Sequence, residues 1–308
     1  MQSPPLPRFE PKRFLVTTDF SVESRIAFPL AVNWATRFGS EIDLIHVWEP
    51  PPRFAGSESV ILLPDPQETR SQLISGLSTL GETYFPASIP VLPHLFSGHP
   101  IPQILRAAED FHSNLIIMAT HGYGGIRHFL LGSVTERVIR RSACPVLSVP
   151  GHPSKGTEPI PAIQGPILLT TDFSEASRHA FPCAVSLAQT LGLPLRLLHV
   201  VQRFPVDALL GTEITRNTAD LLCQNASAEL AHLVQGWKQL SGLRVETHVS
   251  FGHPAAEIQK AAKAFGAGLL VLATHGHTGL RHAYLGSVAE RVVQQAGCPV
   301  LVVPAGLP

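Results

Sequence analysis

The feature that most restricts the folds open to this chain is an internal repeat. Between Met118–Pro150 and Leu272–Pro304, 20 of 33 aligned positions are identical. Equivalent residues lie 153 positions apart early in the repeat and 154 apart late in it, so the two copies align almost without gaps. A duplication on this scale, in a chain of 308 residues, predicts two domains of the same fold.

The most distinctive repeated segment is a glycine-rich loop. Each copy has an apolar run, the tetrad A-T-H-G, nine further residues and the pair G-S. A strand, a glycine-rich loop and a new helix N-terminus together form an anion site, because backbone N–H groups and the helix dipole both face the ligand. An S-x-x-E box also marks a helix start at each G-S pair. The two copies run from Ala119 to Ser133 and from Ala273 to Ser287.

The repeat and the composition of the seam set the expected domain bounds. We predict a first domain at residues 1–150, of which 1–12 are an N-terminal extension, and a second at 165–308. Residues 151–164 are rich in Pro, Gly, Ser and Lys, which is typical of a linker.

Within each unit, short apolar runs alternate with helical patterns. A strand ends near Thr18, and a helix follows Ser21 with a bend or a late start at Pro29 or, in the second copy, Pro182. The third strand carries Pro93 in the first copy and a polar face in the second, both of which favour an edge.

This alternation predicts an α/β fold with two tandem doubly wound five-stranded parallel sheets. If the third strand is an edge, the strand order is 3-2-1-4-5, and the order reverses between strands one and four. Ligands bind such sheets at the carboxyl ends of the strands at that reversal. Asp19 ends strand one and Ala119 ends strand four, so we expect them, and likewise Asp172 and Ala273, to meet at one crevice.

Composition excludes several classes of protein. The formal net charge is zero, which gives nucleic acid or acidic lipid no broad electrostatic attraction. No apolar run reaches the roughly 18 residues of a transmembrane helix, and the proline-rich start lacks the apolar core of a signal peptide. The four cysteines show no metal-binding spacing. We therefore expect a cytoplasmic protein that binds neither nucleic acid nor membrane.

On these motifs the chain resembles a tandem universal stress protein over nearly all of its length. The nucleotide signature of that family is G-x-x-G, nine residues and G-[S/T]; here Ala119 and Ala273 stand at the first glycine. The resemblance implies an adenine nucleotide hydrolase-like fold, with the two units paired about a pseudo-two-fold axis through their fifth strands. A further homodimer of the tandem chain stays open.

The resemblance also implies the ligand and the residues that hold it. The ligand is ATP, or AMP or ADP, with a divalent ion such as magnesium accompanying a triphosphate. The nucleoside would meet the aspartates and the ends of strands one and two, and the phosphates would meet the glycine-rich loop. The expected nucleotide-binding residues are Thr18, Asp19, Val47, Met118, Ala119, His121, Gly122, Arg127, Gly132, Ser133 and Val134, and in the second copy Thr171, Asp172, Val200, Leu272, Ala273, His275, Gly276, Arg281, Gly286, Ser287 and Val288.

Several of these residues have simpler interpretations. Asp19 could be only a helix N-cap. The loop histidines match no common zinc spacing, so we expect no protein metal site and favour loop packing for them. Arg127 and Arg281 could clamp phosphate or be solvated loop residues. His46 and His199 are expected to be hydrogen-bonded core histidines.

Three functions follow from this sequence. The first is a stress-response binding or signalling module whose nucleotide state tunes contacts with an unknown protein partner. The second is a slow ATPase or other adenine-nucleotide enzyme, although no catalytic residues can be assigned and no Walker lysine follows the loop. The third is a scaffold without nucleotide. The loop is nearly identical in both copies, so neither half looks degenerate.

Overall fold

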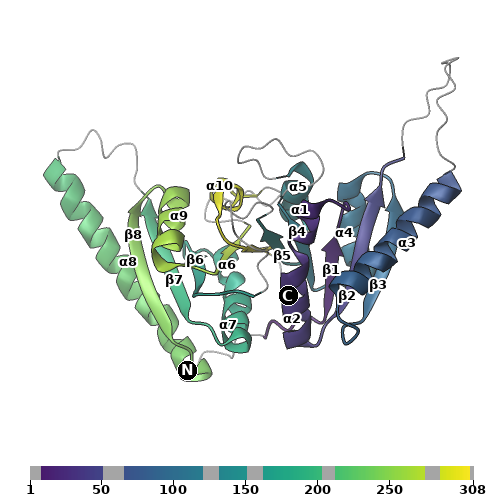
Figure 1. Ribbon diagram of the computed structural model, residues 1–308. Helices are drawn as coiled ribbons and strands as arrows, with labels where there is room; N and C mark the ends of the chain where they lie inside the picture. Colours follow the sequence, from purple (N-terminus) through teal and green to yellow (C-terminus); the bar gives the residue numbers. More distant parts are fainter. Residues whose placement is uncertain are drawn as a thin grey trace, which may run out of the picture.

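The computed structural model describes residues 8–50, 66–120, 132–150, 162–202, 212–274 and 285–305. Helices and strands alternate through these ranges, and the two halves repeat the same series of elements (Figure 1). In the described part of the chain, no helix is both long and apolar enough to cross a membrane.

The described residues of the first half form five strands and five helices. In chain order they are β1 (Arg13–Thr17), α1 (Val22–Arg25), α2 (Phe28–Phe38), β2 (Glu41–Trp48), α3 (Pro66–Tyr84), β3 (Val91–Ser97), α4 (Pro100–Asp110), β4 (Leu115–Ala119), α5 (Ser133–Arg141) and β5 (Val146–Val149).

The second half repeats the series with a longer third helix. Its elements are β6 (Ile167–Thr171), α6 (Glu175–Arg178), α7 (Ala180–Leu191), β7 (Leu195–Gln202), α8 (Thr212–Ser241), β8 (Val245–Gly252), α9 (Pro254–Phe265), β9 (Leu269–Ala273), α10 (Ser287–Gln295) and β10 (Val300–Val303).

The ten strands named above form one sheet in the order β3-β2-β1-β4-β5-β10-β9-β6-β7-β8. Strands within each half pair in parallel, and β5 pairs with β10 antiparallel, with Leu147 opposite Leu301. The predicted order 3-2-1-4-5 and the pairing through the fifth strands are confirmed. The predicted edge position of the third strands is confirmed too, because β3 and β8 end the sheet.

Helices cover both faces of the sheet, and the apolar core continues across the junction of the two halves. On one face, Phe14 of β1 lies in a cluster with α2, α3, α7 and α8 that includes Leu147 and Leu301. On the other face, Leu15 lies in a cluster with α4, α5, α9 and α10 that includes residues of both β5 and β10. The two halves therefore share one pair of core layers.

The helix that follows the first strand is divided in two, as the prolines predicted. α1 ends at Arg25, and α2 begins at Phe28 with Pro29 in its first turn. Proline is tolerated there because the first N–H groups of a helix have no partner within it. The second half has the same division between α6 and α7, with Pro182 as the third residue of α7.

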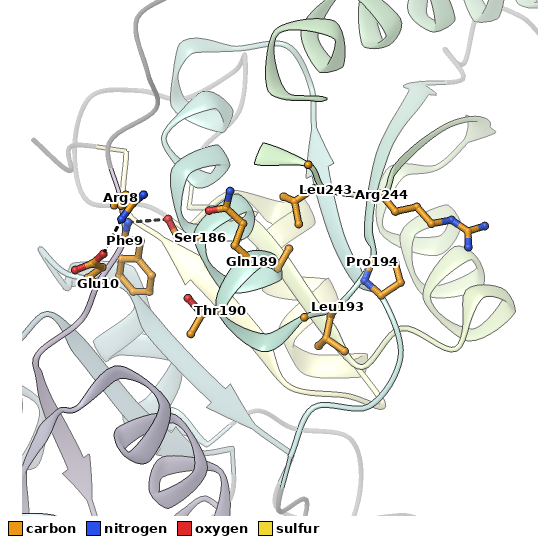
Figure 2. A pocket seen from close by; sticks show the side chains of 13 residues that line it. Arg8, Phe9, Glu10, Ser186, Gln189, Thr190, Leu193, Pro194, Leu243 and Arg244 are labelled. Atoms are coloured by element: carbon orange, nitrogen blue, oxygen red, sulfur yellow. Dashed lines mark hydrogen bonds and ion pairs between the residues drawn. The ribbon is translucent and has the colours of Figure 1, made fainter. Parts of the chain in front are cut away.

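The segment before β1 bridges the two halves. The Phe9 backbone N–H donates a hydrogen bond to Ser186 Oγ on α7 at 2.9 Å, which Figure 2 shows as a dashed line. The Phe9 ring packs against the core cluster that contains α2 and α7. Two residues later, the Pro11 carbonyl accepts a hydrogen bond from Ser40 Oγ, so the same segment is also held by the first half.

We therefore expect Phe9→Ala to lower the free energy of unfolding, measured by urea denaturation, by about 1–3 kcal/mol, because it removes a partly buried ring that packs against the core cluster shared by both halves. Arg8→Ala is the control: its side chain is 82% exposed, and the expected change is within about 0.5 kcal/mol. Equal stability of Phe9→Ala and the wild type would show that this segment does not hold the halves together.

Candidate functional site

A turn stabilised by its own side chains follows β1. Asp19 Oδ1 accepts hydrogen bonds from the Ser21 N–H at 3.0 Å and the Ser21 hydroxyl at 2.5 Å. Thr18 Oγ1 accepts from the Phe20 N–H at 3.0 Å, and Ser21 Oγ accepts from the Ser24 N–H at 3.0 Å. The N-cap of α1 is therefore Ser21. The interpretation of Asp19 as an N-cap is wrong, because its carboxylate holds the turn before the cap.

The same turn follows β6. Asp172 Oδ1 accepts from the Ser174 N–H at 3.1 Å and from its hydroxyl at 2.5 Å, and Ser174 caps α6 by accepting from the Ser177 N–H. Both turns place a phenylalanine in the left-handed region, with φ of 65° at Phe20 and 66° at Phe173. A bulky residue is strained there, so these bonds hold the backbone against a local cost.

A histidine from the neighbouring strand secures the carbonyl at the start of each turn. His46 Nδ1 lies 2.8 Å from the Thr18 carbonyl oxygen, and His199 Nδ1 lies 2.9 Å from that of Thr171. A carbonyl can only accept, so Nδ1 carries the proton. Burial lowers the pKa of His46, against smaller opposing effects of the Thr18 carbonyl and Asp19. The prediction of hydrogen-bonded histidines is confirmed.

The end of β4 meets the start of α5 through close backbone contacts. The Gly132 N–H donates to the Thr120 carbonyl at 2.6 Å, and Thr135 Oγ1 donates to the Ala119 carbonyl at 2.9 Å. A Cβ added at Gly132 would lie 2.6 Å from that Thr120 oxygen, nearer than real Cβ contacts allow. The second half repeats the first bond, from the Gly286 N–H to the Thr274 carbonyl at 2.7 Å. The structure thus requires glycine at residue 132 for the fold itself.

The S-x-x-E boxes mark the helix starts correctly but do not form serine caps. Ser133 and Ser287 are the first helical residues, and Gly132 and Gly286 are the N-caps. Glu136 pairs instead with Arg140, at 2.8 Å. A serine at the first helical position is past the residue whose side chain caps the helix. Both serines are exposed at these helix N-termini.

The turn after β1 and the start of α5 lie close together because β1 and β4 are neighbours in the sheet and their connections leave on opposite faces. A cavity of about 140 Å³ opens at their carboxyl ends. Its lining includes these predicted residues: Thr18, Asp19, Val47, Met118, Ala119, Gly132 and Val134. Ser133 is not in the lining formed by the described residues.

The second half has a larger cavity, of about 510 Å³, at the corresponding ends of β6 and β9. It brings together these predicted residues: Thr171, Asp172, Val200, Leu272, Ala273, Gly286, Ser287 and Val288. The remaining predicted residues lie outside the described residues: His121, Gly122, Arg127, His275, Gly276 and Arg281. In the described part of the chain, no three His, Cys, Asp or Glu side chains gather as metal ligands would.

Some residues that line the cavities were not predicted from the sequence. Pro100 and Pro254 line the two cavities, and their repeated Gly-His-Pro context is visible in the sequence. Leu222, Asn225, Ala226 and Glu229 of α8 also line the second cavity. They lie in the part of the chain where the copies differ, so the repeat gave no signal for them.

Comparisons with known proteins show which family this chain belongs to. The model of the universal stress protein family matches residues 10–150 and again 165–304. A universal stress protein of Mycobacterium tuberculosis is 29% identical over 205 residues, which cover 66% of this chain and 65% of that protein, so the match spans about two thirds of the relative. One of Mycolicibacterium smegmatis is 27% identical over 94% of this chain and 96% of its own length.

The solved structure of a universal stress protein from Archaeoglobus fulgidus has a TM-score of 0.67. It is 20% identical and covers 97% of this chain and 98% of its own. This likeness establishes the fold of the whole tandem chain.

The contact at Gly132 leads to a stability prediction. We expect Gly132→Ala to lower the free energy of unfolding by about 1–3 kcal/mol, because the new methyl must displace the Thr120 carbonyl. Gly297→Ala is the matched control, since a Cβ there meets nothing within 4 Å. If both variants unfold at the same urea concentration, the close approach of β4 and α5 is not a constraint.

The His46 environment leads to a pH prediction. Because its pKa is lowered in the folded protein, the unfolded chain binds the proton more readily. Stability from this residue is present above the ordinary histidine pKa of about 6.5 and is lost as pH falls through the folded-state pKa. Between about pH 7.5 and pH 5, His46→Gln should therefore lose less stability than the wild type in urea unfolding.

The exposed His232 provides the control for this experiment. His232→Gln should keep the pH dependence of the wild type. If the free energy of unfolding of His46→Gln varied with pH as it does in the wild type, the lowered pKa of His46 would be contradicted.

Proposed function

The chain belongs to the universal stress protein family, and from that premise we propose that it is an adenine-nucleotide-binding module of the stress response. Phosphates bind at the starts of α5 and α10, and the nucleoside binds at the ends of the first two strands of each half. The bound nucleotide tunes contacts with a protein partner in the cytoplasm. Turnover is not part of this proposal.

The observation that carries the proposal is the second cavity. Its volume of about 510 Å³ lies in the range of about 300–1,000 Å³ typical of small-molecule sites. It opens at the reversal of strand order, where doubly wound sheets bind their ligands. Its lining joins the ends of β6, β7 and β9 to the first turn of α10.

The phosphate end of the site is supported by the start of α10. The first N–H groups of a helix lack partners within the helix, and the helix dipole places partial positive charge there. Gly286, Ser287 and Val288 all line the cavity at this point. The predicted glycine-rich loop precedes them in the sequence, and its Arg281 would add charge for a phosphate.

The nucleoside end is supported by Asp172 and Val200. Asp172 holds the turn after β6 and also lines the cavity, so its position is fixed by the fold. Val200 follows His199 on β7 and offers backbone groups next to that turn. Magnesium would accompany a triphosphate and would be held mainly by phosphate oxygens and water, as is usual for this ion.

The exposed serines allow a test that spares the fold. Ser133→Asp/Ser287→Asp places a carboxylate in the first turn of α5 and α10, where an acid is favourable for the helix by about 0.3–1 kcal/mol. The same carboxylate repels a phosphate. We expect the double variant to keep its thermal stability and to lose ATP affinity about tenfold or more in isothermal titration calorimetry.

Ser133→Asn/Ser287→Asn is the matched control, with the same shape and no charge, and should keep most of the affinity. The wild type should also release adenine nucleotide on denaturation, detected by mass spectrometry. Absence of bound nucleotide, together with no binding at millimolar ATP, would rule out the proposal.

A further inference from the structure

The two cavities differ in the helix that walls them. In the second half, α8 contributes Leu222, Asn225, Ala226 and Glu229 to the lining. Their spacing of i, i+3, i+4 and i+7 places them on one stripe of the helix. Among the described residues, none from α3 lines the first cavity, which at about 140 Å³ has room for little more than one ring.

The two helices differ at one position that faces this region. Leu77 of α3 and Leu230 of α8 are both fully buried in the same core layer, 153 residues apart. This spacing aligns Gly76 with Glu229. A Cβ at Gly76 would lie 3.2 Å from the Phe20 ring, so that ring packs closely against α3 where glycine leaves room.

In the second half the corresponding residues line the cavity. Glu229 stands where the first half has glycine, and Phe173, the counterpart of Phe20, lines the cavity. The rings also lie differently on their histidines: the interplanar angle is 62° for Phe20 and His46 and 32° for Phe173 and His199. The space that Phe20 closes against α3 is open beside α8.

We propose that the second half is the site for a complete adenine nucleoside phosphate, and that Asn225 and Glu229 of α8 determine its specificity at the nucleoside end. This inference rests on the proposed function. It adds that the site prefers adenine over other bases and that the sites of the two halves are not equivalent.

The position of α8 sets the orientation of the ligand. α8 packs on β7 and β8, whereas the phosphate end is at α10, which packs on α9 (Figure 1). The acids among the described lining residues are Asp172 and Glu229, and no lysine or arginine is among them. Like charge therefore drives phosphate away from α8 and toward α10, and leaves the nucleoside beneath α8.

The chemistry of these side chains favours adenine. A carboxylate only accepts hydrogen bonds, so Glu229 suits the exocyclic amino group of adenine and opposes the oxo group that inosine carries instead. Asn225 lies one turn earlier on the same stripe and can both donate and accept. The site discriminates between adenine and hypoxanthine because the oxo group of inosine and the Glu229 carboxylate are both acceptors and would face each other.

The test isolates each site and compares AMP with IMP by isothermal titration calorimetry. Ser133→Asp leaves the second site intact, and Ser287→Asp leaves the first. Ser133→Asp acts only on the first half, so we expect that protein to keep the AMP affinity of the second site, whereas the Ser287→Asp protein should lose AMP affinity about tenfold or more. In the Ser133→Asp background, Glu229→Gln should weaken AMP by about tenfold and lower its advantage over IMP, because glutamine can donate.

Gln72→Ala on α3, at the position that matches Asn225, is the control and should change neither affinity. Equal AMP affinities of the two serine variants, or an unchanged AMP-to-IMP ratio in Glu229→Gln, would overturn the inference and leave nucleotide binding standing. Failure of every protein, the wild type included, to bind either nucleotide or ATP would instead remove the proposed function.

Discussion

The antiparallel pairing of β5 with β10 is the interaction on which the whole structure depends. A doubly wound parallel sheet of five strands would otherwise leave its fifth strand as an open edge with unpaired backbone groups. Here Leu147 and Leu301 face each other across the pair, and both core layers run through it. The segment at Phe9 reinforces the same junction from outside the sheet. The halves are therefore one folded body, although the sequence reads as two domains.

Each candidate site is built from bonds that the fold needs in any case. The turn at Asp19 closes through Ser21, and the histidine of the next strand holds the Thr18 carbonyl. Gly132 is fixed by its contact with Thr120. Rigid support of this kind reduces the ordering cost of ligand binding. It also means that a change at these residues alters stability, which is why the exposed serines are better probes of the proposed nucleotide binding.

The two halves share the turns and helix starts around each cavity but differ in the helix that lies next to it. The turns and the helix starts keep the same geometry in both halves, while α3 and α8 differ in length and in what they present to the site. A polar cluster on the sheet also differs between the halves while the surrounding fold is kept. The buried Asp43 pairs with Arg13 and His94, and at the corresponding place Arg196 pairs with Glu246. The sign of the charge at this position is inverted, yet each charge has an oppositely charged partner; Asp43 is buried, whereas Arg196 and Glu246 are partly exposed.

The sequence alone determined the repeat, the alternation of strands and helices, the strand order and the family, because these depend on local periodicity and on motifs repeated at fixed spacing. It also placed Asp19 and Ala119 at one crevice, since the reversal of strand order follows from which strand is the edge. Only the tertiary structure showed that Ser133 follows the N-cap and that Asp19 precedes it. Those assignments depend on backbone angles that several turn types share.

The tertiary structure also decided the difference between the sites. Nearly identical loops suggested two matching halves, but Phe20 packs against α3 at Gly76, whereas Phe173 and Glu229 both line the second cavity. Contacts between residues distant in sequence set that packing, and no local pattern encodes them.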